Sequence, residues 1–146
     1  MKKILMAYDG SETSNKVVDV ATSCATKEDE IVLLTVIPAE LIDSSFTRML
    51  LPTIDLSQMV KPGTFKEKAR KSLKQIADGI KDKVKAVEIV VEDGDAADEI
   101  LLTAKKYGCN VIAIGYKGYG KEGRFLIGSV ADKVIRHASV SVMIVR

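Results

Sequence analysis

The sequence has no tryptophan, a single histidine and only two cysteines. Cys24 and Cys109 are too few and too far apart for a disulfide framework or a metal cluster, so we expect both to be small core residues in a reducing compartment. The chain begins with only a short apolar run before Asp9, which is too short for a signal peptide or a membrane span. These scarcities favour a cytoplasmic protein with no membrane partner.

A strong excess of either charge is also missing, because 22 basic residues nearly balance 20 acidic ones. Nucleic acids demand a clustered basic surface, so we expect no nucleic-acid partner. Hydrophobic residues make up 47% and charged residues 29% of the 146 residues, a balance typical of one globular domain that buries a real core.

Apolar runs and amphipathic segments alternate along the chain. Short apolar runs predict buried strands at 4–7, 31–37, 87–91, 111–114 and 140–145. Apolar residues at helical spacing predict helices near 17–25, 65–80, 95–104 and 128–135, and Asp95 is expected to cap the third of them. Strands that alternate with helices predict an α/β fold, a single-domain open parallel sheet with helices on both faces.

Residues 39–62 interrupt this alternation. They begin after Pro38, end at Pro62 and carry large apolar side chains, among them Phe46, Met49, Leu50, Leu51, Ile54 and Met59. A polar linker would not be so hydrophobic. We therefore interpret 39–62 as an insertion that packs on the sheet or on a second subunit.

Glycines gather after the fourth predicted strand, at Gly115, Gly118, Gly120, Gly123 and Gly128, and Ser129 follows where the last helix begins. Glycine lets the backbone approach a ligand closely, and the free N–H groups at a helix start favour an anion. The stretch lacks the P-loop pattern, and its match to Gly-x-Gly-x-x-Gly does not follow the first strand. We favour a phosphate-binding loop over a set of plain turn residues.

Asp9 directly follows the first predicted strand, within Asp9-Gly10-Ser11. Ligands of open parallel sheets bind at the carboxyl ends of the strands, where the strand order reverses. An aspartate at this place either contacts a ligand or closes an Asx turn and caps the next helix. We favour the ligand role for Asp9.

Taken together, several segments resemble the universal stress protein family. The spacing Gly115-x2-Gly118-x9-Gly128-Ser129 resembles the ATP-binding signature of that family. Further similar segments are Lys2 to Leu5 with Asp9 to Glu12, Leu34 to Pro38, Gly94-Asp95, and Gly128 to Ala138. The resemblance spans the chain, 1–146, except for 39–62, which is variable in the family.

This resemblance implies a Rossmann-like sheet with the strand order 3-2-1-4-5 and an ATP site at its carboxyl edge. It implies that Ala7 and Val36 line the adenine pocket, with Val36 offering backbone hydrogen bonds. Asp9 and Gly115 would lie at the ribose.

The same resemblance implies that the phosphates are held by Gly118, Gly128, Ser129 and Val130. The nucleotide would be ATP, or AMP or ADP, accompanied by Mg²⁺ or Mn²⁺. A homodimer paired through the C-terminal strand is also implied, and the apolar, proline-free residues 139–145 favour it because such an edge is usually covered.

Three functions stay open at this point. The first is an ATP-binding module whose loop orders on binding and alters what partners meet. The second is a slow ATPase or nucleotidyl transferase, and the third is a dimeric interaction module without nucleotide. Hydrolysis needs a base and usually a metal held by carboxylates, yet only Asp9, and more distantly Glu122, could serve. We therefore favour the first function and assign no catalytic residue.

A phosphoreceiver domain shares the alternating pattern and is a further alternative. It requires an acidic pair after the first strand and an aspartate nucleophile after the third. Asp9 stands alone, and the acidic residues 92–95 lie in a different context, so the sequence disfavours this reading.

Overall fold

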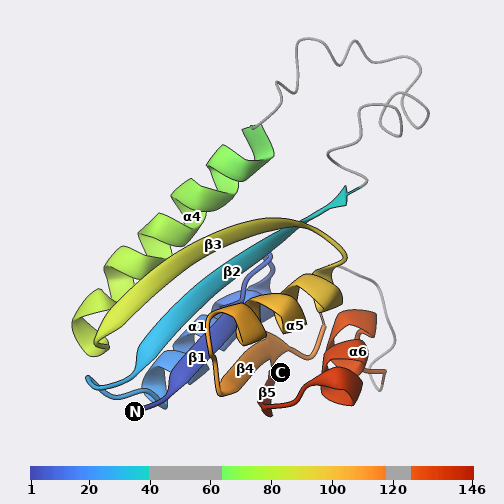
Figure 1. The fold of residues 1–146 in the computed structure, drawn as a ribbon. Coiled ribbons are helices and arrows are strands. Elements are labelled where there is room, and N and C mark those ends of the chain that lie inside the picture. Colours follow the sequence, from blue (N-terminus) through green and yellow to red (C-terminus); the bar gives the residue numbers. More distant parts are fainter. Residues whose placement is uncertain (40–63, 118–125) are drawn as a thin grey trace.

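The computed structural model describes residues 1–39, 64–117 and 126–146. Its strands are β1 (Lys3–Ala7), β2 (Glu30–Pro38), β3 (Ala86–Gly94), β4 (Val111–Gly115) and β5 (Ser141–Val145). They form one parallel sheet in the order β3-β2-β1-β4-β5 (Figure 1). The predicted α/β class and the strand order 3-2-1-4-5 are therefore confirmed.

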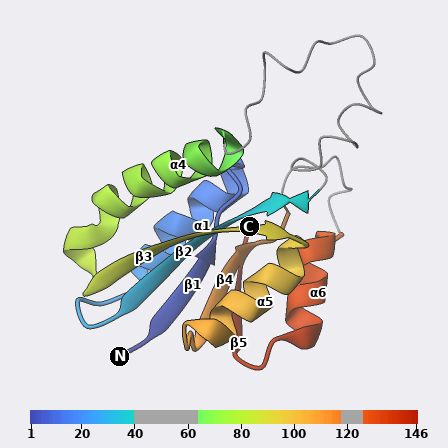
Figure 2. The ribbon, with the colours of Figure 1, turned by 45° about the horizontal axis from the view of Figure 1, so that its top comes forward.

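Helices cover both faces of this sheet. Those in the described ranges are α1 (Glu12–Ser23), α4 (Thr64–Ile80), α5 (Ala96–Lys106) and α6 (Ser129–His137), with a short 3-10 turn, η1 (Lys81–Lys83), after α4. α1 and α4 pack on one face and α5 and α6 on the other (Figure 2). Right-handed crossovers produce this division, because the chain moves outward from β1 to β3 and then returns to β4 on the other side of β1. No helix within the described ranges is long and apolar enough to cross a membrane.

Along the central strands, successive side chains alternate between two separate hydrophobic cores, one on each face of the sheet. In β1, Ile4 and Met6 join the core under α1 and α4, whereas Leu5 joins the core under α5 and α6. β2 divides in the same way, with Leu33 on the first face and Leu34 on the second. A strand buried on both faces has no polar face, which is why these strands appear in the sequence as continuous apolar runs.

Side-chain caps fix where two of the helices begin. Ser11 precedes α1 and its hydroxyl accepts a hydrogen bond from the N–H of Ser14 at 3.2 Å. Asp95 precedes α5 and accepts from the N–H of Asp98 at 2.9 Å, as the sequence predicts. α5 ends at Lys106, and Gly108, with a φ of 66°, turns the chain toward β4.

β3 extends to Gly94, beyond the predicted end at residue 91, because Glu92 and Asp93 of this edge strand still pair with β2. Cys109 is buried as expected, but Cys24 is exposed after the end of α1, so the prediction that it is a core residue is wrong. The predicted insertion 39–62 lies outside the described residues except for Ala39.

A buried carboxylate, that of Asp29, links chain segments at the edge of the sheet where β1 and β2 begin. Asp29 is only 2% exposed and accepts hydrogen bonds from the N–H groups of Lys2 and Thr26 and from the Thr26 hydroxyl. The Lys2 ammonium lies 3.3 Å from its second oxygen. The pKa of Asp29 is held well below its ordinary value, chiefly by the Lys2 N–H and further by Thr26, while burial opposes the shift.

We expect Asp29→Asn to lower the melting temperature by several degrees at neutral pH, because charge-assisted bonds to a buried carboxylate are lost. A depressed pKa in the folded state means that the unfolded chain binds the proton more tightly. The stabilisation by Asp29 is therefore complete above its ordinary pKa of 3.8 and is lost as the pH falls through the lower folded value. Thermal melts between neutral pH and about pH 2 test this.

The exposed Asp82 supplies the control for this experiment. Asp82→Asn should leave the melting temperature and its acid dependence as in the wild type. An Asp29→Asn variant with the wild-type melting temperature at neutral pH would contradict the assigned role of this carboxylate.

Candidate functional site

The unequal lengths of β1 and β2 leave a notch at the carboxyl edge of the sheet. The ladder between them ends at the pair Ala7 and Leu34, followed by one more bond from the Tyr8 N–H to the Leu34 carbonyl at 2.8 Å. β2 continues to Pro38. Because alternate residues of a strand turn their backbone groups to the same side, the N–H and C=O of Val36 face the side where β1 has ended. They are therefore open to a ligand.

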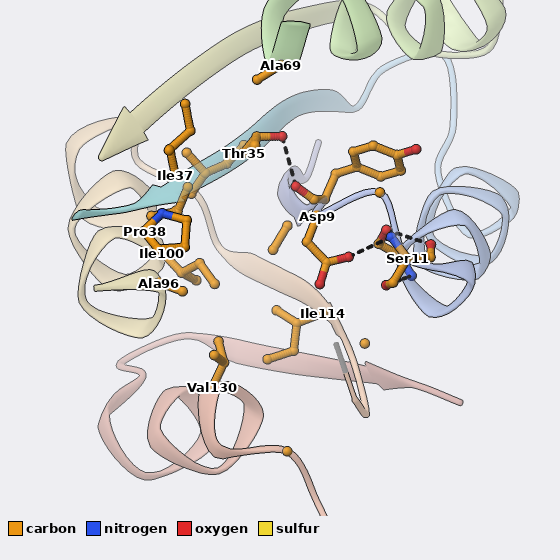
Figure 3. A pocket seen from close by; sticks show the side chains of 18 of the residues that line it. Asp9, Ser11, Thr35, Ile37, Pro38, Ala69, Ala96, Ile100, Ile114 and Val130 are labelled. Atoms are coloured by element: carbon orange, nitrogen blue, oxygen red, sulfur yellow. Dashed lines mark hydrogen bonds between the residues drawn. The ribbon is translucent and has the colours of Figure 1, made fainter. Parts of the chain in front are cut away.

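Asp9 lies in the turn from β1 to α1. One carboxylate oxygen accepts from the N–H of Ser11 at 2.9 Å, and Gly10, with a φ of 83°, allows the turn. The Asx turn that the sequence offered as an alternative therefore exists. No described residue donates to the second oxygen of Asp9, and the exposed side chain extends into the open space of Figure 3. One side chain can thus hold its turn and still contact a ligand.

The start of α6 is the second polar feature of this edge. Gly128 is its N-cap and provides no side-chain hydrogen bond, and the first bond within the helix runs from Asp132 N–H to Gly128 C=O at 2.9 Å. The N–H groups of Ser129, Val130 and Ala131 therefore have no partner in the helix. Together with the helix dipole they form a place for an anion.

Glycine is required at residue 115 for packing. A Cβ added to Gly115 would come within 2.7 Å of the Cγ2 atom of Thr13 on α1 and 3.1 Å of the Lys117 carbonyl. At Gly128 an added Cβ would come within 3.2 Å of the Tyr116 carbonyl, to which the Gly128 N–H also donates at 2.9 Å. These glycines let α1, the end of β4 and the start of α6 approach one another closely.

A cavity of about 740 Å³ surrounds these features, a volume within the usual range of ligand sites. It reaches over the carboxyl edge onto both faces of the sheet. We call the part on the face of α5 and α6 the α6 wing, and its lining is Ala7, Val36, Ala96, Ile100, Ile114, Gly128, Ser129, Val130 and Ala131. We call the part on the face of α1 and α4 the α4 wing, and its lining is Tyr8, Ile37, Phe65, Lys68, Ala69 and Ser72. Asp9 lies between Ala69 and Val130 in Figure 3.

The cavity brings together seven of the eight residues that the sequence nominates. They are Ala7, Asp9, Val36, Gly115, Gly128, Ser129 and Val130. Gly118 lies outside the described residues. Sequence reasoning missed the α4 residues of the α4 wing, because they have the pattern of an ordinary amphipathic helix. Only the end of β2, at Ile37 and Pro38, gave a signal in that direction.

Charges beside the α6 wing tie its two helices together. Lys133 of α6 lies 3.1 Å from Asp95 and 2.8 Å from Asp98, both at the start of α5. The pKa of Lys133 is raised by Asp98 and then Asp95, and the pKa of Asp95 is lowered by the Asp98 N–H and then by Lys133. Burial raises the pKa of Glu99, and the carboxylates of Glu92 and Asp93 add to the rise.

Protein ligands for a metal are scarce at this edge. Within the described parts of the chain, no group of three or more His, Cys, Asp or Glu side chains is arranged to hold a metal ion. Asp9 is the carboxylate in the cavity lining. A divalent ion here would depend mainly on ligand phosphates and water, which suits Mg²⁺.

The fold defines a Rossmann-like α/β protein, and the cavity at its carboxyl edge lies where the strand order reverses beside β1. The model of the universal stress protein family matches residues 1–146, so the chain belongs to this family.

Comparison with known proteins agrees with membership of this family. The chain is 27% identical over 146 residues to the universal stress protein YxiE of Bacillus subtilis, covering 99% of this chain and 98% of that protein. Among solved structures, the hypothetical protein MJ0577 superposes with a TM-score of 0.80 at 27% identity, covering 99% of this chain and 94% of the other.

Two more distant structures share the fold and carry nucleotides. A universal stress protein in complex with cAMP has a TM-score of 0.66 at 20% identity, covering 99% of this chain and 96% of that one. The Arabidopsis thaliana protein At3g01520 with AMP bound has a TM-score of 0.63 at 17% identity, covering 99% of this chain and 90% of that one.

The close approach at Gly115 yields a prediction. Gly115→Ala should destabilise the protein by about 1–3 kcal/mol, because the new methyl group overlaps the Thr13 methyl group. Thr13→Ser removes that methyl group and should restore most of the loss in the double variant. Urea unfolding of the four proteins measures the coupling energy. Additive effects of the two substitutions would show that Thr13 is not the obstacle.

Proposed function

We propose that this universal stress protein binds an adenine nucleotide, preferentially ATP, in the α6 wing and acts as a nucleotide-responsive regulatory module. The observation that carries the proposal is the uncapped start of α6, which faces the same cavity as the open backbone of Val36. An anion site and a hydrogen-bonding edge for a flat base thus line one cavity. The nucleotides carried by two structural neighbours support this assignment.

Different residues of the α6 wing would contact different parts of the nucleotide. Ala7, Ile100 and Ile114 provide apolar surface for the adenine, and the Val36 backbone provides its hydrogen-bonding edge. The second oxygen of Asp9 accepts from a ribose hydroxyl.

The phosphates would occupy the other end of the wing. They would meet the N–H groups of Ser129 and Val130, with Gly115 and Gly128 allowing close approach and Gly118 as a further expected contact. The described lining offers a metal ion one carboxylate, that of Asp9, which is too few protein ligands to hold it. We therefore propose that Mg²⁺ or Mn²⁺ reaches the site bound to the phosphates.

Slow ATP hydrolysis stays the second candidate. Asp9 is exposed to the cavity and could orient a water, whereas Glu122 lies outside the described residues. We assign no catalytic residue. We also propose a cytoplasmic location, because two cysteines without a disulfide suit a reducing compartment.

Ser129→Asp tests the nucleotide site without threatening the fold. An acidic side chain in the first turn of a helix stabilises the helix but repels a bound phosphate. We expect calorimetric titration to show ATP affinity about tenfold weaker, and AMP affinity less affected, with an unchanged or raised melting temperature. This variant is cleaner than one at Gly128, where a side chain would press on the backbone of residue 116.

Lys27→Gln is the matched control, because it makes the same change in net charge at an exposed position outside the cavity lining. Its nucleotide affinity should equal that of the wild type. If wild-type protein takes up neither ATP nor AMP, the nucleotide proposal fails and the interaction module without nucleotide becomes the leading function.

We also propose a homodimer that pairs through β5. This strand is an edge of the sheet, and Val142, Met143 and Ile144 are only partly buried in the isolated chain. Apolar edge strands are usually covered.

Val142→Lys should therefore halve the mass seen by light scattering, because a charge would be buried between the paired strands. Val87→Lys, on the opposite edge strand β3, is the matched control and should keep the wild-type mass. A wild-type protein that is monomeric at micromolar concentration would rule out this dimer.

A further inference from the structure

The α4 wing is the part of the cavity that the nucleotide proposal leaves unused. Tyr8, Ile37, Phe65 and Ala69 pack against the core under α1 and α4, whereas the α6 wing belongs to the opposite face of the sheet. In Figure 3, Ala69 lies on the side of α4 and Val130 on the far side of Asp9. A nucleotide placed along Val36 and the start of α6 therefore does not fill the α4 wing.

The walls of the α4 wing are apolar and partly aromatic. The rings of Tyr8 and Phe65 and the side chains of Ile37 and Ala69 contribute to its lining. The Tyr8 ring is held by its hydroxyl, which donates to the Asn15 side chain at 3.0 Å. A fixed ring offers contact area to a ligand without a further loss of side-chain freedom.

Lys68 is a cation of this lining whose ammonium is not paired within the described ranges. Lys68 is exposed to the cavity, and no described acidic residue forms an ion pair with it. Its neighbour Lys66, by contrast, is paired with Asp93 of β3 at 3.0 Å. Ser72, one turn further along α4, adds a hydroxyl group without a hydrogen-bond partner among the described residues.

The surrounding charge favours an anion as well. α4 carries five basic residues, at 66, 68, 70, 71 and 74, against two acidic ones, Glu67 and Asp78. Asp78 lies near the far end of the helix, where it approaches Lys81 at 3.7 Å. The part of α4 that lines the cavity is therefore positive overall.

From this juxtaposition of aromatic side chains, an ammonium that no described carboxylate pairs with, and a hydroxyl, we infer that the α4 wing is a second binding site, for a small aromatic anion. The aromatic body packs between Tyr8, Phe65 and Ala69, and the acidic group meets Lys68 and Ser72. The two wings meet at Asp9, and their linings have no residue in common. This site does not depend on the nucleotide proposal.

Anilinonaphthalenesulfonate is a suitable probe, because it is an aromatic anion whose fluorescence rises in an apolar site. Titration of the nucleotide-free protein should show one saturable site. Lys68→Glu should weaken the binding about tenfold, because one attractive charge becomes repulsive. Lys71→Glu makes the same change in charge at an exposed position of α4 outside the cavity lining, and it should bind the probe like the wild type.

The Ser129→Asp variant separates this inference from the nucleotide proposal. It should retain wild-type probe binding and bind ATP more weakly, whereas Lys68→Glu should bind the probe more weakly and retain wild-type ATP affinity. Probe binding that is insensitive to Lys68→Glu, or weakened equally by Lys71→Glu, would overturn the inference. Probe binding that is lost in Ser129→Asp would overturn it too, since the probe would then occupy the α6 wing.

Discussion

Parallel pairing of all five strands is the constraint on which the site depends. It places every carboxyl strand end at one edge of the sheet, together with the start of each following helix. The chain turns back beside β1, so the helices that follow β1 and β4 lie on opposite faces and a crevice opens between them. The Asp9 carboxylate and the start of α6 meet at this crevice although they are far apart in the sequence.

The sequence predicted the fold well because burial on both faces leaves a strong signal. Strands such as 31–34 are apolar at every position, and Asp95 and Gly108 mark the ends of α5 by side-chain chemistry. Edge elements were harder. Glu92 and Asp93 belong to β3, because an edge strand can keep charged residues in its ladder. A strand predicted from an apolar run alone therefore ends too early.

The candidate site was predictable where its residues are glycines or directly follow a predicted strand, as Asp9 does. Gly128 and Ser129 could be predicted from the glycine spacing, and the end of β2 from Pro38. Gly115 also lies there, but the structure gives it a second reason, since Thr13 leaves no room for a side chain. The α4 side of the cavity could not be predicted from the sequence. Lys68 and Ser72 line it only because the folded chain places α4 beside the end of β2.

The start of α6, where we propose the anion site, and the β5 edge are joined by hydrogen bonds through one residue, Tyr116. Tyr116 donates its N–H to the Val145 carbonyl at 2.7 Å and accepts from the Gly128 N–H at 2.9 Å. The guanidinium of Arg146 also lies 4.6 Å from the centre of the Tyr116 ring. Any displacement of the α6 start would therefore be transmitted through Tyr116 to the end of β5. Since Gly128 is the N-cap of α6 and Val145 is the last residue of β5, the two hydrogen bonds of Tyr116 link the position of the α6 start to the end of the edge strand.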